Sequence, residues 1–318
     1  MMLQTCSSNI IAFPPGENNK AQGREAVRPN PVPEREDVDM DRNKFAGYLL
    51  VTDMDGTLLD SEKRISPENE AAIRRFTEQG GRFTLATGRI AASAKPYADR
   101  LPLNAPAILY NGVVIHDFKR GENVWEQTLP VSCAGVLERV KSKFPGIGIE
   151  IYPQGADIPF FLQDNLMTER HRRIEGFPER PISSPGEAPG PWSKILFAWD
   201  PELLDEYTDT IVAQTQGAEI EWVRSDDRYL EILPFGATKG HALERLMDML
   251  DIPRENTIAL GDHLNDLEMI RRAGTGIAVA NAHPNLLSEA KRRGVHHNEH
   301  AIADAVAWLE RRIDGEEA

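Results

Sequence analysis

The chain has 318 residues, a formal net charge of −14 at pH 7 and a sequence pI near 5.1. Because 41% of the residues are hydrophobic, it can bury one large core or two ordinary ones, and we expect two domains. The acidic balance argues against nucleic acid or an anionic membrane surface as the main partner. An anionic substrate would therefore need a locally positive site.

Cysteine usage and apolar runs indicate the compartment. Cys6 and Cys133 are too few for a disulfide framework and fit no metal motif, which favours a reducing environment. No apolar run reaches the roughly 18 residues that a membrane span needs, and the N-terminus lacks the basic segment of a secretory signal. We therefore expect a cytoplasmic protein. Residues 1–44, rich in Pro, Gly, Asn and charge, are predicted to form a disordered leader.

The most informative segment is Leu50–Asp60, where an apolar strand runs directly into Asp53, Met54, Asp55 and Gly56. Residues i and i+2 of extended backbone point the same way, so both carboxylates can face one point. Each would raise the pKa of the other, so the pair indicates a divalent metal or a shared proton. Asp-x-Asp-Gly is also ordinary turn chemistry. The position after a strand favours a site, because open α/β sheets bind ligands at the carboxyl ends of their strands.

A second predicted strand also ends at polar residues. The strand Arg82–Ala86 leads into Thr87, Gly88 and Arg89, and a helix is predicted from Ile90 onward. A hydroxyl and free backbone N–H groups therefore lie at a strand-to-helix junction, which suits an anion. An ordinary helix N-cap at Thr87 is an equal alternative.

The next segment carries the strongest hairpin signal in the sequence. Asn111 and Gly112 lie between the apolar runs 107–110 and 113–116, a pattern typical of a hairpin with a type I′ turn. That turn is sufficient to explain Asn111.

From about residue 124 to 225 the pattern changes, and we expect a separate α+β domain. Dense basic charge around residues 167–173 favours a solvated helix face over a substrate contact. The elements predicted in this insert are a helix (131–144), a strand (147–152), a Pro/Gly-rich loop (178–191) and a strand–helix–strand unit (194–222).

Two later segments add charged groups at element ends. Lys239 lies at the start of a predicted helix through Leu250, where a cation is unfavourable against the helix dipole. Its position indicates a bound anion, although an exposed lysine is the alternative. The strand 257–261 is followed at once by Asp262, with Asn265 and Asp266 as helix-capping residues.

The remaining pattern completes an alternating β/α order, which predicts a parallel, doubly wound sheet. His296, His297 and His300 have no cysteine beside them, so we do not expect a structural zinc site. The elements are a strand (229–233), a helix (267–272), a strand (275–280) and two helices (284–293 and 299–313).

Taken in order, these segments resemble a haloacid dehalogenase (HAD) superfamily phosphatase of the Cof type, subfamily IIB. The resemblance covers about residues 46–318. It implies a Rossmann-like doubly wound core, 45–123 and 226–318, with an inserted α+β C2B-type cap, 124–225. The four motifs of the family correspond to Asp53–Leu59, Thr87–Arg89, Lys239–Gly240 and Gly261–Asp266.

The resemblance also implies roles for individual residues. Asp53 is the nucleophile that gives an aspartyl-phosphate, and Asp55 protonates the leaving oxygen and later activates water. Mg²⁺ takes oxygens from Asp53, the backbone carbonyl of Asp55 and Asp262, whereas Asp266 is a ligand or a group behind the ligands. The residues expected to hold the phosphate are Thr87, Gly88, Lys239 and Asn265.

We therefore expect a Mg²⁺-dependent phosphatase of small phosphorylated metabolites, with sugar phosphates as the favoured class. A phosphomutase that uses the same nucleophile is the nearest alternative, and a non-catalytic binding protein that keeps the fold is a more distant one. In this family the cap selects the substrate, and no motif in residues 124–225 identifies it.

Overall fold

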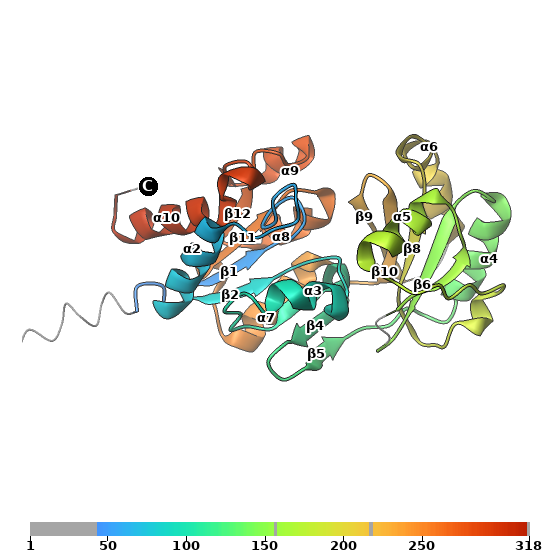
Figure 1. Ribbon diagram of the computed structural model, residues 1–318, viewed down its shortest axis with the longest axis horizontal. Helices are drawn as coiled ribbons and strands as arrows, with labels where there is room; N and C mark the ends of the chain where they lie inside the picture. Colours follow the sequence, from blue (N-terminus) through green and yellow to red (C-terminus); the bar gives the residue numbers. More distant parts are fainter. Residues whose placement is uncertain (1–42, 156–157, 216–218, 317–318) are drawn as a thin grey trace, which may run out of the picture.

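The computed structural model describes residues 43–155, 158–215 and 219–316, so nearly all of the predicted leader and Cys6 lie outside them. Two bodies lie side by side, with the first and last parts of the described chain in one body and the middle part in the other (Figure 1). We call them the core and the cap. Among the described helices, none is both long and apolar enough to span a bilayer.

The core is built on a parallel sheet in the order β13-β12-β11-β1-β2. All four residues of β1 are buried, as expected for the centre of a sheet covered on both faces. The predicted doubly wound sheet is confirmed. Its strands are β1 (Leu49–Thr52), β2 (Arg82–Leu85), β11 (Thr257–Gly261), β12 (Thr275–Ala278) and β13 (Arg292–Arg293).

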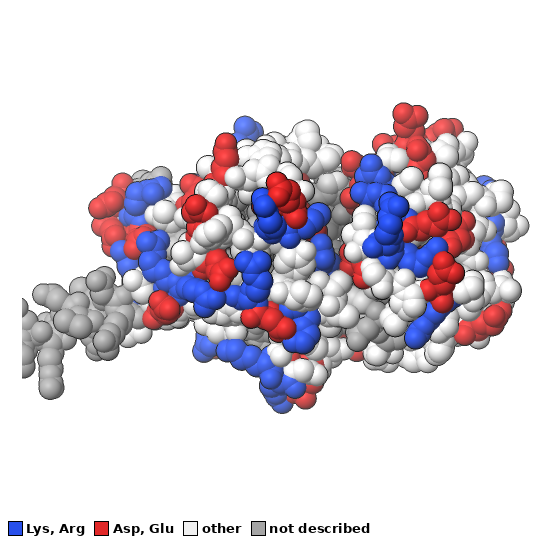
Figure 2. Space-filling model, viewed as in Figure 1, with Lys and Arg blue, Asp and Glu red and all other residues white. Residues whose placement is uncertain are grey.

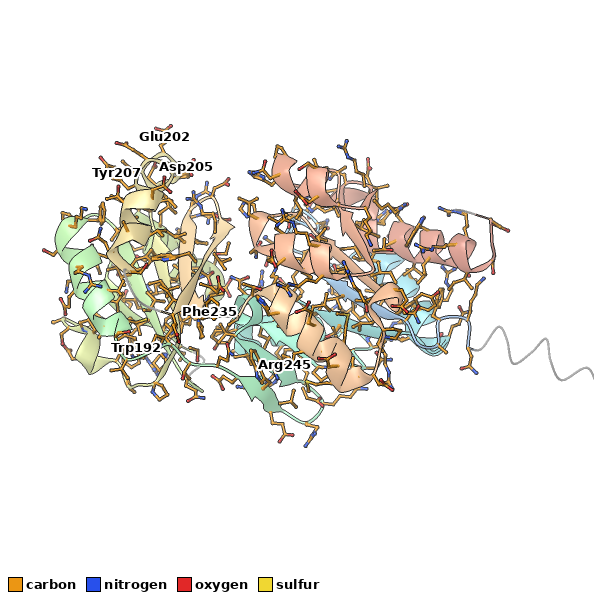
Figure 3. All side chains as sticks on the ribbon, turned by 180° about the vertical axis from the view of Figure 1, so that it is seen from behind. Trp192, Glu202, Asp205, Tyr207, Phe235 and Arg245 are labelled. Carbon is orange, nitrogen blue, oxygen red and sulfur yellow. The ribbon has the colours of Figure 1, made fainter. Side chains whose placement is uncertain are left out.

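Helices cover both faces of this sheet. α2 packs on α10, and α7 packs on α8; α2 and α3 are in front in Figure 1, whereas α7 and α8 are in front in the reverse view of Figure 3. Ser66 caps α2 by accepting from the Asn69 N–H, and Pro67 follows as its first residue. The core helices are α2 (Pro67–Glu78), α3 (Ala91–Ala98), α7 (Lys239–Leu250), α8 (Leu267–Arg272), α9 (Pro284–Glu289) and α10 (Ala301–Ile313).

One local expectation for the core is wrong, the helix 284–293, and one of the two alternatives for Thr87 is excluded. α9 ends at Glu289 because the residues after it turn into the edge strand β13, which pairs with β12. The residue that precedes α3 is Ile90, so Thr87 is not the N-cap of that helix. Its hydroxyl instead accepts from the Arg89 N–H at 3.2 Å, within the strand-to-helix loop.

An antiparallel unit of β3 (Ala107–Leu109), β4 (Val114–Asp117) and β5 (Glu122–Glu126) extends the core. The predicted hairpin forms, but Leu109 pairs with Val114, so four residues connect the strands in place of a two-residue type I′ turn. Gly112, at φ +109°, lies so close to the backbone of Thr238 that any Cβ would clash. Packing against the start of α7 therefore sets the shape of this connection.

The cap is a five-stranded antiparallel sheet in the order β7-β6-β8-β10-β9. Its strands are β6 (Gly148–Pro153), β7 (Phe160–Gln163), β8 (Trp192–Ala198), β9 (Ile220–Asp226) and β10 (Tyr229–Pro234). Its helices are α4 (Cys133–Lys143), α5 (Leu166–Glu175) and α6 (Pro201–Val212).

The cap sheet continues past the boundary expected at residue 226. β9 and β10 are joined by only Asp227 and Arg228, so β10 folds back onto its neighbour and also pairs with β8. Local pairing across such a short connection makes β10 a strand of the cap sheet. We propose Pro234 as the end of the cap sheet; the connection that follows it carries the exposed Phe235 (Figure 3).

The strands of the cap sheet alternate between two kinds of residue. Apolar side chains of β6, β8 and β10 are buried in one cluster with residues of α4 and α6, as a period of two requires. The side chains between them belong to the opposite face, which lines the cavity between cap and core. Those on the second face include Tyr152, Lys194, Leu196 and Glu231.

Candidate active site

A cavity of about 260 Å³ lies between the core and the cap. From the core, the residues that follow β1, β2 and β11 line it, including Asp53, Gly88 and Asp262. From the cap, side chains of α5 and of β6, β8, β9 and β10 close the opposite wall. The cavity therefore lies at the carboxyl ends of the parallel strands, where open α/β sheets bind ligands.

Lys239 joins two of the acidic residues at the floor of this cavity. Its Nζ donates to Asp53 Oδ1 at 2.6 Å and to Asp266 Oδ1 at 2.7 Å, and its side chain is fully buried. The other oxygen of Asp266 accepts from the backbone N–H groups of Asp262 (3.0 Å) and His263 (3.2 Å). Both oxygens of Asp266 are therefore engaged, one by Lys239 and the other by the loop after β11.

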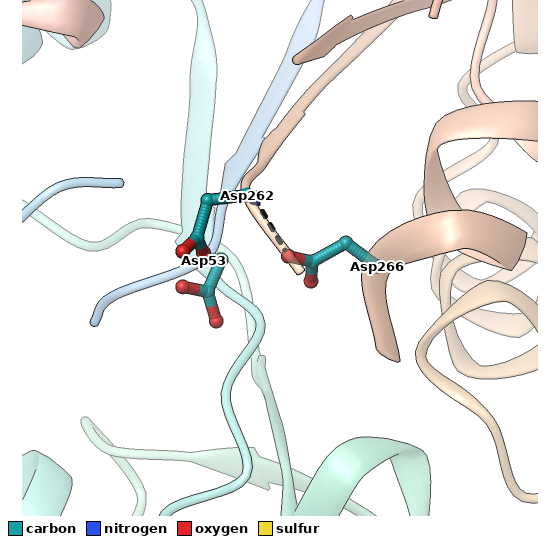
Figure 4. A group of neighbouring side chains, drawn as sticks. All are labelled: Asp53, Asp262 and Asp266. Atoms are coloured by element: carbon teal, nitrogen blue, oxygen red, sulfur yellow. Dashed lines mark hydrogen bonds between the residues drawn. The ribbon is translucent and has the colours of Figure 1, made fainter. Parts of the chain in front are cut away.

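Asp53, Asp262 and Asp266 form a compact acidic group. Figure 4 shows the carboxyl groups of Asp53 and Asp262 close together, with Asp266 joined to the Asp262 backbone. One carboxylate oxygen from each residue lies within 4.8 Å of the others. Of the described residues, these three form the group of His, Cys, Asp or Glu side chains that could share a metal ion, and the histidines near residue 300 do not belong to it.

The electrostatics of this group favour a bound cation. Burial raises the pKa of Asp53 to about 7, partly offset by Lys239, and raises the pKa of Asp262 to about 9 with help from the charge of Asp53. Lys239 brings one positive charge to a group of three carboxylates, so two negative charges remain uncompensated when all three are ionised. Oxygen ligands with that charge fit a divalent ion such as Mg²⁺ or Ca²⁺. Because the oxygens of Asp266 are already engaged, Asp53 and Asp262 are the side chains that could hold it.

The turn after Asp55 is shaped around Asp262. Gly56 has φ +84°, and a Cβ there would clash with the carboxylate of Asp262. Thr57 Oγ1 donates to Asp262 Oδ1 at 3.2 Å, and Asn281 Nδ2 donates to the Gly56 carbonyl at 2.8 Å. Only a glycine at position 56 lets the first and the last motif segments approach this closely.

The side chain of Asp55 points to two cations. Arg89 donates to both of its oxygens, at 2.7 and 2.8 Å, and Lys63 Nζ lies 2.7 Å from Oδ1. Burial would raise the pKa of Asp55, but these cations outweigh it and lower that pKa to about 2. Asp55 is therefore an ionised carboxylate in this arrangement.

The predicted phosphate-binding loops also meet here. Gly88 and Asn265 line the cavity, and Asn265 Nδ2 donates to Asn111 Oδ1 at 3.0 Å. Asn111 Nδ2 and Asn265 Oδ1 are buried and have no hydrogen-bond partner among the described residues. A Cβ on Gly88 would lie 3.0 Å from the Asn111 amide, so the absence of a side chain at Gly88 allows the two loops to lie this close.

The structure brings together all of the residues predicted for the site. Sequence reasoning missed Lys63 and the part played by Arg89, and it explained Asn111 as a turn residue. Arg89 was visible as a cation directly after the Thr-Gly pair. Lys63 and Asn111 gave no such signal, because each reaches the site through a loop whose path depends on tertiary packing.

Comparison with known proteins agrees with this geometry. Residues 50–306 match the model of the haloacid dehalogenase-like hydrolase family. The chain belongs to this family. It is an enzyme of the HAD phosphatase type, and the resemblance inferred from the four motifs is confirmed.

Named relatives of this HAD-like hydrolase are phosphatases. A putative phosphatase, YxeH, of Bacillus subtilis (strain 168) is 30% identical over 273 residues, which cover 82% of this chain and 97% of the relative. The HMP-PP phosphatase of Serratia proteamaculans (strain 568) is 30% identical over 277 residues, covering 82% and 95%. A solved HAD subclass IIB sugar phosphatase has the same fold, with a TM-score of 0.71, 20% identity and coverage of 82% and 98%.

Proposed function

We propose that this enzyme is a Mg²⁺-dependent phosphatase of small phosphorylated metabolites, with sugar phosphates as the favoured class, and that Asp53 carries the phosphoryl group. The observation that carries the proposal is the position of Asp53. Its carboxylate lies at the floor of the cavity, is held by Lys239 and faces Asp262. The named phosphatases among the relatives support the same reaction class.

The proposed reaction has two displacements. A carboxylate oxygen of Asp53 attacks phosphorus, the bond to the leaving oxygen breaks, and Asp55 gives that oxygen its proton. Water then attacks the phosphorus of the aspartyl-phosphate, Asp55 takes a proton from it, and the bond to Asp53 breaks to release inorganic phosphate. General acid–base help of this kind contributes roughly 10²–10⁴-fold.

The other residues stabilise charge. The Thr87 hydroxyl, the Gly88 N–H and the Asn265 amide are donors at the phosphate position, and Lys239 offsets charge from below. Mg²⁺ held by Asp53 and Asp262, with the carbonyl of Asp55, would neutralise charge on the transferring group.

Asp55 can act as an acid only when its carboxyl group carries a proton. While Arg89 and Lys63 hold its carboxylate, its low pKa keeps the proton away. A bound phosphate dianion offers both cations a more highly charged partner. We propose that they turn toward the substrate when it binds, which frees Asp55 to carry the proton to the leaving oxygen.

The test is a phosphate-release screen across phosphorylated metabolites, with and without Mg²⁺, on the native protein and on Asp53→Asn. We expect release only with Mg²⁺, and a loss of at least about 10³-fold in Asp53→Asn, while circular dichroism shows an intact fold. Retained activity in Asp53→Asn would refute the nucleophile assignment. Isomerised sugar phosphate without free phosphate would instead favour a phosphomutase.

A further inference from the structure

Three charged residues lie in the middle of the apolar cap strands, on the face turned toward the core. Glu150, Lys194 and Glu231 are each no more than 3% exposed. Burying a charge is costly unless it is paired, and an apolar pair of similar size would often be at least as stable. Stability therefore does not explain the charges at these positions, and a role in binding does.

Two of these charges form a pair that borders the cavity. Lys194 Nζ lies 3.2 Å from Glu231 Oε2, and Ser225 Oγ donates to Glu231 Oε1 at 2.6 Å. Lys194 Nζ also donates to the carbonyl of Gly88 at 3.4 Å, which places the cap lysine directly against the predicted phosphate-binding loop. The leaving group of a phosphate held at that loop must therefore pass beside this pair.

Glu150 holds two other residues of the same wall in place. It accepts from Tyr152 Oη at 2.6 Å and from His171 Nδ1 at 3.0 Å, and both partners line the cavity. Tyr152 in turn lies beneath Lys194, whose Nζ is 4.6 Å from the ring centroid. The orientation of the lysine is thus fixed from two sides before any ligand arrives.

We propose that Lys194, Glu231 and Ser225 bind the hydroxyl groups of the leaving group, so that the substrates are monophosphates of small uncharged polyols such as sugars. This inference rests on the proposed phosphatase function. An ammonium group offers three donors and a carboxylate about four acceptor positions, so the pair keeps hydrogen-bonding capacity for a ligand. Adjacent hydroxyls can accept from the lysine and donate to the glutamate at once.

The charge of the wall argues against a second phosphate on the substrate. The cap residues that line the cavity include three basic side chains, Arg170, His171 and Lys194, and three acidic ones, Glu175, Asp226 and Glu231. This balanced set gives no excess of positive charge for another dianion, whereas it offers a neutral polyol both donors and acceptors.

The size of the cavity agrees with this class. Its volume of about 260 Å³ falls below the ~300–1,000 Å³ typical of pockets for drug-sized ligands. A phosphate group with a small sugar or polyol suits such a space better than a nucleotide or a lipid phosphate.

The experiment compares two substrates in one double variant. Lys194→Met with Glu231→Leu removes both charges together, because removal of one partner would leave the other buried and unpaired. We compare glucose 6-phosphate, or the best sugar phosphate of the screen, with 4-nitrophenyl phosphate, which has no hydroxyl on its leaving group. We expect kcat/KM for the sugar phosphate to fall on the order of 10–100-fold, as for lost hydrogen bonds to charged groups. The value for the aryl phosphate should change less than about threefold.

Two further variants keep the result interpretable. Ser225→Ala is a milder change and replaces the double variant as the test if that variant does not fold. It should lower kcat/KM for the sugar phosphate several-fold. Asp205 lies on α6 and is labelled in Figure 3. Asp205→Asn breaks its pair with Arg224 of β9, outside the residues that line the cavity, and should leave kcat/KM for both substrates unchanged.

A binding measurement separates this inference from the proposed function. In an Asp53→Asn background, calorimetry should show that the Lys194/Glu231 replacement weakens the binding of glucose 6-phosphate but not the binding of inorganic phosphate. An equal loss for both ligands, an equal loss for both substrates, or no loss at all would overturn the inference. Failure of the native enzyme to hydrolyse any phosphate ester would overturn the proposed function, and the binding result would still decide the role of the pair.

Discussion

Lys239 shows how one residue can serve both the fold and the site. Burial would lower its pKa, but the charges of Asp266 and Asp53 outweigh this and raise it, so the side chain stays protonated. It sits at the first position of α7, where the helix dipole disfavours a cation, and two carboxylates compensate for both penalties. The sequence pointed to this lysine by that unfavourable position and by its match to the third family motif.

We predict that Lys239→Ala lowers kcat/KM for a phosphate ester by at least about 10²-fold, the scale of one lost charge-stabilising group. The same change should lower thermal stability in EDTA, because the buried carboxylates of Asp53 and Asp266 lose the lysine that they share, and Mg²⁺ should restore part of the loss. Activity assays and melting curves measure the two effects. Lys95→Ala, which breaks only the exposed pair with Asp99, is the control, and an unchanged kcat/KM in Lys239→Ala would exclude the lysine from the site.

The sequence predicted the helices, strands and site residues whose positions depend on nearby residues of the chain. Asp53, Thr87 and Asp262 follow strands whose buried character is plain in the sequence, so the site at the strand ends could be found. The connection through Asn111 and the placement of β10 could not, because packing on α7 shapes the first and pairing with β8 completes the second. The charged residues of the cap strands left a signal that was overlooked, a single charge inside each apolar run.

The contact between the β3–β4 connection and α7 gives a second prediction. Gly112→Ala should lower stability by about 1–3 kcal/mol, because Gly112 has φ +109° and its Cβ would clash with the Thr238 backbone. Since Lys239 follows Thr238, activity should fall as well. Gly121→Ala is the matched control: its φ is +68° but no atom lies within 4 Å of the added Cβ. If both variants melt at the same temperature and keep equal activity, the close approach does not position α7.

For the whole molecule, the question is how a chain with a net charge of −14 accepts an anion. Figure 2 shows basic side chains on both sides of the recess between core and cap, those of the cap lying over α5, with acidic ones among them. Within the cavity, Lys63 and Arg89 add positive charge beside Asp55, and Arg170 adds positive charge from the cap wall. The local field, not the net charge, therefore decides what binds, and the aspartates beneath it require a cation of their own.

That requirement links metal binding to the pH dependence of stability. The pKa values of Asp53 and Asp262 are raised from an ordinary value of 3.8 to about 7 and about 9. At a pH between the ordinary pKa and the raised pKa of each group, the folded, metal-free protein binds more protons than the unfolded chain. Its stability from these groups is thus complete below about pH 4 and is lost as the pH rises through the folded-state pKa values. A divalent cation can replace the protons.

We therefore predict that the gain in melting temperature from saturating Mg²⁺ over EDTA, at matched ionic strength, is small near about pH 5 and grows to several degrees near about pH 8.5. At the lower pH the metal must displace protons from both carboxyl groups, whereas at the higher pH it relieves their repulsion. Asp262→Asn should melt higher than the native protein in EDTA at the higher pH and respond little to Mg²⁺, because one of the repelling charges and one ligand are gone together. A Mg²⁺ gain that does not change with pH, or one that Asp262→Asn retains in full, would place the metal away from these two aspartates.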